Sequence, residues 1–340
     1  MIRRAAVAVA IALVLLALFV ALVGWEDVLG AMERATLSVY VGAFLGTTVC
    51  LAFRSGVWNR VLTVVDEPRP YWLVLGVFLT GSFVKYVTPY GQVASGVGVA
   101  AIVGRYTDAA YEESLAAVVS ADFLNYLPYY TFGAVAVVAV FVLESPPVDV
   151  RAYVLPVTAV VVGVAVLFSV LWARRELVRA GAFRVASSVR ELIARVSERK
   201  ARLLNRENLE RRLEGFYTTL ELVSRNRRTM TVALVYAHLG WLGLAGALYA
   251  TALSLDAPVT FGVAMLVVAL SKLGFLIPTP GGIGGVEATL AAVLFLLTPM
   301  TVAVATATAI LFRFATYWFT VLVGGLTAVA LTIDDPLPPE

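Results

Sequence analysis

The chain has 340 residues, of which 60% are hydrophobic and 14% charged. Soluble domains are about 45–50% apolar and about 25% charged, so this chain is more apolar and less charged than they are. Together with a mean hydropathy of +0.88, this composition excludes a water-soluble globule, a disordered chain and a coiled coil. One cysteine, Cys50, and one histidine, His238, exclude a disulfide framework and a Cys-rich or His-rich metal site. The sequence therefore predicts an all-α polytopic membrane protein.

Apolar segments long enough to cross a bilayer, which takes about 20 residues, recur along the chain. The first, residues 5–23, has the basic start of a signal peptide. Its apolar run exceeds the roughly 7–15 residues of such peptides, so we expect a retained span. The second, residues 36–53, is predicted to end at Arg54. Four further segments give about six full spans: residues 115–143, 153–172, 231–253 and 301–331.

Residues 71–103 are apolar but interrupted by a break that contains Pro89, Gly91 and Gln92. The two arms, of about 11–16 residues, are too short to cross about 30 Å of hydrocarbon. Proline lacks the amide donor of a continuing helix, and glycine frees the backbone. The sequence therefore predicts a re-entrant helical hairpin.

Residues 259–297 have the same design. A helix that carries Lys272 ends at the sequence PTPGGIGG, residues 278–285, and Glu287 and a second apolar arm follow. Irregular backbone at membrane depth is tolerated only where protein or a water-filled cavity covers it. We expect a second re-entrant hairpin whose broken segment lines an interior.

Basic residues next to the spans predict the orientation. Residues 174–228 hold 15 of the 26 lysines and arginines and only seven of the 23 acidic residues. The positive-inside rule places such a segment in the cytoplasm. The chain is predicted to be a multi-pass protein of the plasma membrane. Alternation of the spans then places its N-terminus and its C-terminus in the cytoplasm as well. The two hairpins are predicted to enter the membrane from opposite faces.

Residues 36–143 and residues 231–331 thus each contain a span, a broken hairpin and a span, in opposite orientation, within a single membrane domain, residues 1–340. Inverted repeats with helices broken at matching places are typical of secondary transporters, whose binding sites lie at the breaks. The alternative is that such breaks occur in any polytopic protein and that the symmetry is accidental.

Five ionisable residues are predicted at membrane depth: Lys85, Asp122, Lys272, Glu287 and Arg313. Each costs about 2.5–3.5 kcal/mol at the centre of a helix, so we expect them to face inward and to pair. Glu287 is expected to pair with Arg313, and Asp122 with Lys85 or Lys272. Such pairs either serve transport or only hold the hairpins in place, and the sequence leaves both alternatives open.

The second break has features of a ligand site. Its glycines allow close approach of a ligand to the backbone, and a helix that starts near residue 286 directs free amide groups at an anion such as phosphate. The carboxylate of Glu287, in the first turn, would itself offset the partial positive charge at the start of this helix. Asn125 lies beside Asp122, and Tyr317 follows Arg313 at i+4 on one helix face. The predicted substrate-binding or translocation residues are Lys85, Pro89, Gly91, Gln92, Asp122, Asn125, Lys272, Pro280, Gly281, Gly282, Gly284, Gly285, Glu287, Arg313 and Tyr317.

Residues 174–228 contain two amphipathic helical patterns, over residues 185–196 and 209–223, with arginine-rich polar faces. Such helices lie on an anionic leaflet. The alternative is a cytoplasmic helical hairpin that contacts a partner. Nucleic-acid binding is not expected, because acidic residues are interleaved with the basic ones.

Three sequence motifs carry a resemblance to a known family. They are TPYGQ at residues 88–92, PGGIGGVE at residues 280–287 and, after an apolar helix, LFRFATYW at residues 311–318. With these motifs, about residues 5–332 resemble the lysylphosphatidylglycerol synthase transmembrane-region family, in the form of a stand-alone archaeal-type member. The resemblance implies a flippase-like integral membrane protein that moves a lipid or lipid-linked head group between leaflets.

The sequence thus predicts a flippase-like transporter of an anionic lipid or lipid-linked head group, with no cofactor or metal. Catalytic residues are not expected, because no nucleophile–base or metal-ligand motif is present. The alternatives are a membrane enzyme acting on a polyprenyl or lipid phosphate and a non-transporting scaffold for a lipid or glycan synthase. The expected partners are membrane lipids, such a synthase and a second copy of the chain in a homo-oligomer.

Overall fold

A computed structural model describes residues 2–88, 96–107, 109–143, 206–277 and 279–334. These residues form helices and contain no strand, which confirms the all-α prediction. The predicted span over residues 153–172 and the first amphipathic pattern lie outside the described residues. Five described segments are long and apolar enough to cross a bilayer: Leu37–Leu62, Tyr111–Val140, Arg227–Ser254, Pro280–Leu297 and Val302–Leu331.

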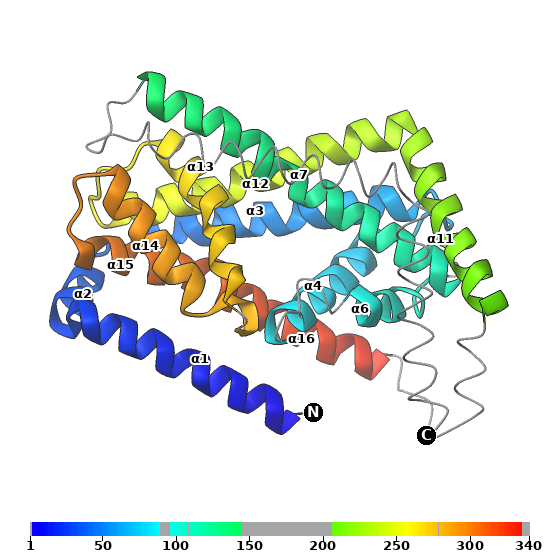
Figure 1. The fold of residues 1–340 in the computed structure, drawn as a ribbon, viewed down its shortest axis with the longest axis horizontal. Helices are drawn as coiled ribbons and strands as arrows, with labels where there is room; N and C mark the ends of the chain where they lie inside the picture. The colour runs from blue at the N-terminus through cyan, green and yellow to red at the C-terminus, as the bar shows by residue number, and fades with distance from the viewer. Residues whose placement is uncertain (1, 89–95, 108, 144–205, 278, 335–340) are drawn as a thin grey trace.

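Three long helices run side by side along the longest axis of the molecule (Figure 1). They are α3 (Leu37–Leu62), α7 (Tyr111–Leu143) and α12 (Arg227–Ser254). Helices α3 and α12 approach so closely that a Cβ atom built on Gly46 would lie 2.6 Å from the carbonyl oxygen of Gly243. Small residues at helix contacts permit such approach where the hydrophobic effect is absent. This contact joins the first half of the chain to the second.

Helix α3 is longer than the sequence predicted. We expected the second span to end at Phe53, because Arg54 follows it, but the helix continues to Leu62. The side chains of Val57, Trp58 and Val61 in this extension are fully buried. Their burial extends the helix past Arg54, which therefore lies inside the bundle and not in a loop.

The first hairpin comprises α4 (Tyr71–Val87) and α6 (Gly96–Val103), which contact each other and α7. In Figure 1 both lie in the half of the bundle where α3 ends. A Cβ atom on Gly81 of α4 would lie 3.0 Å from the Cγ1 atom of Val99, so the two arms meet closely there. The predicted break, with Pro89, Gly91 and Gln92, lies outside the described residues.

The second hairpin lies in the opposite half of the bundle (Figure 1). Its α-helix α13 (Phe261–Leu270) was predicted to run to residue 277, but the backbone changes at Ser271 to the 3-10 segment η2 (Ser271–Leu276). A short 3-10 turn η3 (Pro280–Gly282) then leads to α14 (Gly285–Leu297). The two arms touch through backbone, since a Cβ atom on Gly285 would lie 2.3 Å from the carbonyl oxygen of Gly274.

The last predicted span contains a local change of helix type. It consists of α15 (Val302–Arg313), the π-helical turn η4 (Phe314–Trp318) and α16 (Phe319–Asp334). Single π-helical turns inside α-helices are frequent at functional sites. This turn begins directly after Arg313 and contains Tyr317. Both residues belong to the predicted site.

The remaining helices lie around this bundle. Helix α1 (Ile2–Val23) and the short helix α2 (Trp25–Glu33) pack on α15 through a cluster that includes Val20, Val28 and Ala307. Helix α11 (Arg206–Arg225) contains the second predicted amphipathic pattern and contacts α7.

Candidate functional site

The expected ion pair of the second half is present and is buried. The Nε atom of Arg313 donates to Oε1 of Glu287 over 2.8 Å, and the two side chains are 7% and 2% exposed. A second nitrogen of Arg313, Nη2, donates to the main-chain carbonyl of Gly281 over 2.7 Å. The remaining oxygen of Glu287 accepts from the amide of Gly284 over 2.8 Å. One pair therefore joins the last span to the irregular loop and to the first turn of α14.

The irregular loop is shaped around Tyr317. Gly281 has a φ of +58°, and a Cβ atom there would lie 2.0 Å from the ring of Tyr317. The Tyr317 ring also lies 4.2 Å from the Arg313 guanidinium. Across the bundle it contacts Tyr86 near the end of α4, with ring centroids 5.3 Å apart, and its hydroxyl donates to the Tyr86 carbonyl over 3.4 Å. The end of the first arm of one hairpin therefore touches the last span beside the broken loop of the other, and α4 also contacts the η3 turn of that loop.

The first half contains a second ion pair. The sequence left Asp122 with two possible partners, and in the structure Lys85 pairs with Oδ2 of Asp122. The indole Nε1 of Trp58 donates to Oδ1 over 3.2 Å, and the Lys85 ammonium lies 5.3 Å from the Trp58 ring centroid. Asn125 donates to the main-chain carbonyl of Arg54 over 3.2 Å. This pair joins the first hairpin to α7.

Lys272 has aromatic neighbours in place of the carboxylate that the sequence allowed. Its ammonium lies 4.3 Å from the ring centroid of Tyr129, 4.8 Å from Phe275 and 5.5 Å from Tyr126. Aromatic faces attract a cation through their quadrupole, by about 2 kcal/mol or more when desolvated. No acidic residue in the described part of the chain lies within ion-pair distance of Lys272. The positive charge of Lys272 is thus stabilised by contacts with aromatic ring faces.

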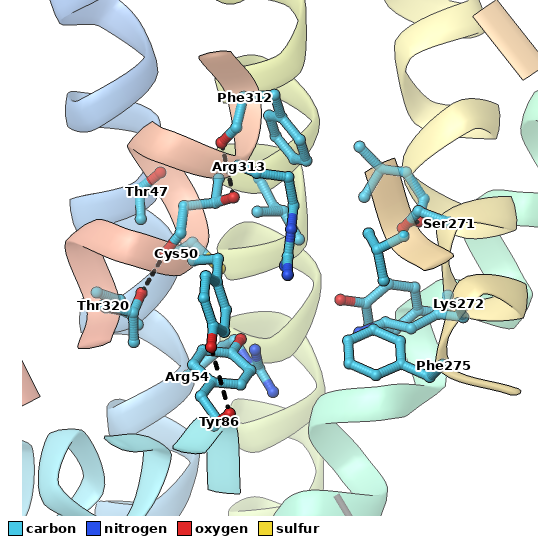
Figure 2. A pocket seen from close by; sticks show the side chains of 17 residues that line it. Thr47, Cys50, Arg54, Tyr86, Ser271, Lys272, Phe275, Phe312, Arg313 and Thr320 are labelled. Carbon is cyan, nitrogen blue, oxygen red and sulfur yellow. Dashed lines mark hydrogen bonds between the residues drawn. The ribbon is translucent and has the colours of Figure 1, made fainter. Parts of the chain in front are cut away.

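A cavity of about 50 Å³ lies among α3, α7, the second hairpin and the last span (Figure 2). Several water molecules fit in such a volume. Its basic lining residues are Arg54, Lys272 and Arg313, and no aspartate or glutamate lines it in the part of the chain that the structure describes. Figure 2 shows these three side chains around one open space. The cavity is therefore an electropositive space inside an apolar bundle.

Sequence reasoning missed Arg54 as a site residue. Its Nε atom is buried without a hydrogen-bond partner, and its guanidinium lies 5.9 Å from the ring centroid of Tyr126. The available signal was the spacing of Thr47, Cys50 and Arg54, which places polar and small side chains on one face of α3. All three line the cavity.

The predicted site residues thus fall into separate groups. Glu287 and Arg313 meet at the second break, together with Pro280, Gly281 and Tyr317. Asp122 and Asn125 lie on α7, and Lys85 reaches Asp122 from α4. Among the predicted set, Lys272, Arg313 and Tyr317 line the cavity. The single histidine, His238 of α12, lies between helices, since its Nε2 atom lies 3.0 Å from the Thr131 hydroxyl of α7.

These features define the class of protein: a multi-pass helical membrane protein with two shorter apolar helices, Tyr71–Val87 and Phe261–Leu276, and a basic cavity inside the bundle. Residues 5–324 match the lysylphosphatidylglycerol synthase TM region family. The chain belongs to this family, as the three motifs suggested. A search of curated proteins finds no significant match to the chain.

Proposed function

We propose that the protein is a flippase-like transporter that moves an anionic lipid or lipid-linked head group between the leaflets. The observation that carries the proposal is the cavity, which three basic side chains line and no described acidic side chain lines. Ionisable residues inside a membrane protein mark substrate pathways, because their cost is retained only where they serve a function. Membership of the family supports the same function.

The arrangement of the helices supports alternating access. The two hairpins lie in opposite halves of the bundle, and each is preceded and followed by a long helix (Figure 1). We propose that residues 36–143 and 231–331 form inverted repeats, which in secondary transporters rock against each other around a site at the repeat interface. The contact between Tyr86 and Tyr317 lies at this interface.

Charge supports the orientation. Helix α11 and the end of α16 lie at the same end of the bundle in Figure 1. Residues 174–228 are strongly basic, and basic segments next to spans face the cytoplasm. We therefore propose that this end faces the cytoplasm; both termini are proposed to be cytoplasmic from the alternation of the spans across the plasma membrane.

Transport is tested with the full chain in vesicles that contain a fluorescent phosphatidylglycerol or a fluorescent phosphatidylcholine. A membrane-impermeant reductant added outside quenches only the outer leaflet, so lipid movement appears as additional quenching. Wild type is expected to move the anionic lipid faster than the zwitterionic one, and Arg313→Ala to abolish this difference. Arg313→Lys keeps the charge and serves as the matched control.

Two outcomes contradict the proposal. Equal quenching in protein-containing and protein-free vesicles removes transport and favours the scaffold, for which deletion of residues 174–228 would abolish function while Arg313→Ala would not. Chemical turnover of the lipid by wild type, lost in Glu287→Gln, favours a membrane enzyme.

A further inference from the structure

The three cations of the cavity differ in what already surrounds them. Arg313 donates from Nε to Glu287 and from Nη2 to the Gly281 carbonyl, so its charge is balanced and two of its nitrogens are engaged. Arg54 and Lys272 have no carboxylate within ion-pair distance among the residues that the structure describes. The cavity therefore has two positive charges that the surrounding protein does not balance.

The side chain of Arg54 has unused donor capacity at this cavity. Its buried Nε atom has no hydrogen-bond partner. A buried donor left unpaired destabilises the protein, and more strongly when it is charged. The guanidinium lines the cavity from α3, one turn beyond Cys50. A ligand that accepts hydrogen bonds there removes this destabilisation.

Lys272 approaches the same space from the second hairpin. Its ring neighbours Tyr126, Tyr129 and Phe275 stabilise the ammonium without neutralising it. The Tyr126 ring also lies near the Arg54 guanidinium, 5.9 Å from its centroid, so one ring is close to both cations. Arg54 and Lys272 thus face one small volume from two different elements.

We infer that Arg54 and Lys272 together bind the phosphoryl group of the substrate, while Glu287 and Arg313 position the loop beside it. The inference rests on the proposed function in taking this cavity as the head-group site. Arginine presents a planar fork that matches phosphate oxygens, and lysine adds a point charge. A volume of about 50 Å³ admits a small polar group and no acyl chain, so the acyl chains stay outside the cavity.

The site is tested by calorimetric titration of the purified full chain in a neutral detergent. The probes are dioctanoyl phosphatidate, dioctanoylglycerol and sodium phosphate. The first shares its acyl chains with the second and its phosphoryl group with the third, so the comparison separates a lipid head group from a free phosphate. Wild type is expected to bind phosphatidate and not dioctanoylglycerol. Binding of sodium phosphate as tight as that of phosphatidate supports the site and identifies a free anion as its ligand.

The variants are Arg54→Gln and Lys272→Gln, with Arg60→Gln as the control. Arg60 lies on the same helix as Arg54, and its side chain is exposed and outside the cavity. Loss of one charged hydrogen-bond donor weakens binding by about tenfold or more, so each cavity variant is expected to lose at least tenfold in affinity and Arg60→Gln none. Where a glutamine variant is not monodisperse, Arg54→Lys replaces it, with a several-fold loss expected because the fork is missing.

Wild-type affinity for phosphatidate in both Arg54→Gln and Lys272→Gln overturns the inference, as does a wild type that binds neither phosphate probe. The result is independent of transport. If wild type binds phosphatidate through these two residues but moves no lipid in vesicles, the site stands and the proposed function fails. If wild type moves lipid and Arg54→Gln binds as wild type does, the function stands and the site fails.

Discussion

Each half of the molecule joins its hairpin to the following long helix by one ion pair, but the two pairs differ in polarity and burial. In the first half the hairpin supplies the cation, Lys85, and α7 supplies Asp122. In the second half the hairpin supplies the anion, Glu287, and the last span supplies Arg313. The first pair is 11% and 21% exposed, and the second is 7% and 2% exposed.

The difference in burial comes with a difference in what each pair supports. The pair of the second half also holds the Gly281 carbonyl and the Gly284 amide, so it fixes an irregular backbone. The pair of the first half contacts the indole of Trp58 and no loop backbone in the described part of the chain. The comparison indicates that the second hairpin is held rigidly at its break and that the first is held along its arm.

The largest expected effect is at the second pair. Glu287→Ala leaves the Arg313 guanidinium buried without its carboxylate, and breaking a buried pair costs about 3–5 kcal/mol. Thermal unfolding in detergent measures the loss. The double variant with Arg313→Ala is expected to lose less than the sum of the two single variants. Strictly additive losses would show that the two side chains do not depend on each other.

The arms of the two hairpins provide the next test. Gly285→Ala forces a Cβ atom against the carbonyl oxygen of Gly274, which is backbone, whereas in Gly81→Ala the nearest atom to the added Cβ is a methyl carbon of the Val99 side chain, at 3.0 Å. We expect a loss near 3 kcal/mol for the first change, the upper end for overpacking, and about 1 kcal/mol for the second. Gly246→Ala, with no atom within 4 Å, is the control. Equal melting temperatures for Gly285→Ala and Gly246→Ala would contradict the close contact.

A smaller effect is expected at the first pair. Lys85→Met leaves Asp122 with the Trp58 indole as its donor, and the carboxylate is partly exposed, so we expect a loss of about 2 kcal/mol in the free energy of unfolding. Adding Asp122→Asn removes the unpaired charge and is expected to restore part of the loss. A larger loss than that of Glu287→Ala would reverse the comparison between the halves.

The smallest effect concerns the contact between the halves. Thr131→Val removes the hydroxyl that lies 3.0 Å from the His238 ring, between α7 and α12. Hydrogen bonds between membrane helices contribute about 0.6 kcal/mol, so the unfolding temperature is expected to shift only slightly. A loss above that of Lys85→Met would show that this contact, and not the pairs within each half, dominates the assembly.

The predictions from sequence were confirmed where a feature depends only on the residues of a single segment. The predicted spans over residues 36–53, 115–143 and 231–253 coincide with α3, α7 and α12, because the bilayer requires long apolar segments with satisfied backbone. The start of α14 beside residue 286 and the pair of Glu287 with Arg313 also followed, since few charges are available at that depth. The sequence did not predict whether Lys85 or Lys272 pairs with Asp122. This choice depends on which hairpin packs against α7 beside Asp122.

Arg54 shows most clearly where sequence reasoning failed. An arginine after an apolar run is the usual mark of a span that has reached the interface. Here the helix continues for two more turns because Val57, Trp58 and Val61 are buried by other elements. Only those neighbours distinguish a basic residue at a membrane surface from one inside a bundle.

The sequence by itself determined the class of protein, the break before α14 and the few charges at membrane depth, because bilayer thickness and the cost of unpaired polar groups act on each segment separately. The tertiary structure alone decided which charges are balanced. It placed Arg313 against a carboxylate, surrounded Lys272 with aromatic rings and left the buried Nε of Arg54 without a partner. The reason is that the environment of a charge is formed by side chains from several helices, whose relative positions are fixed only when the helices pack.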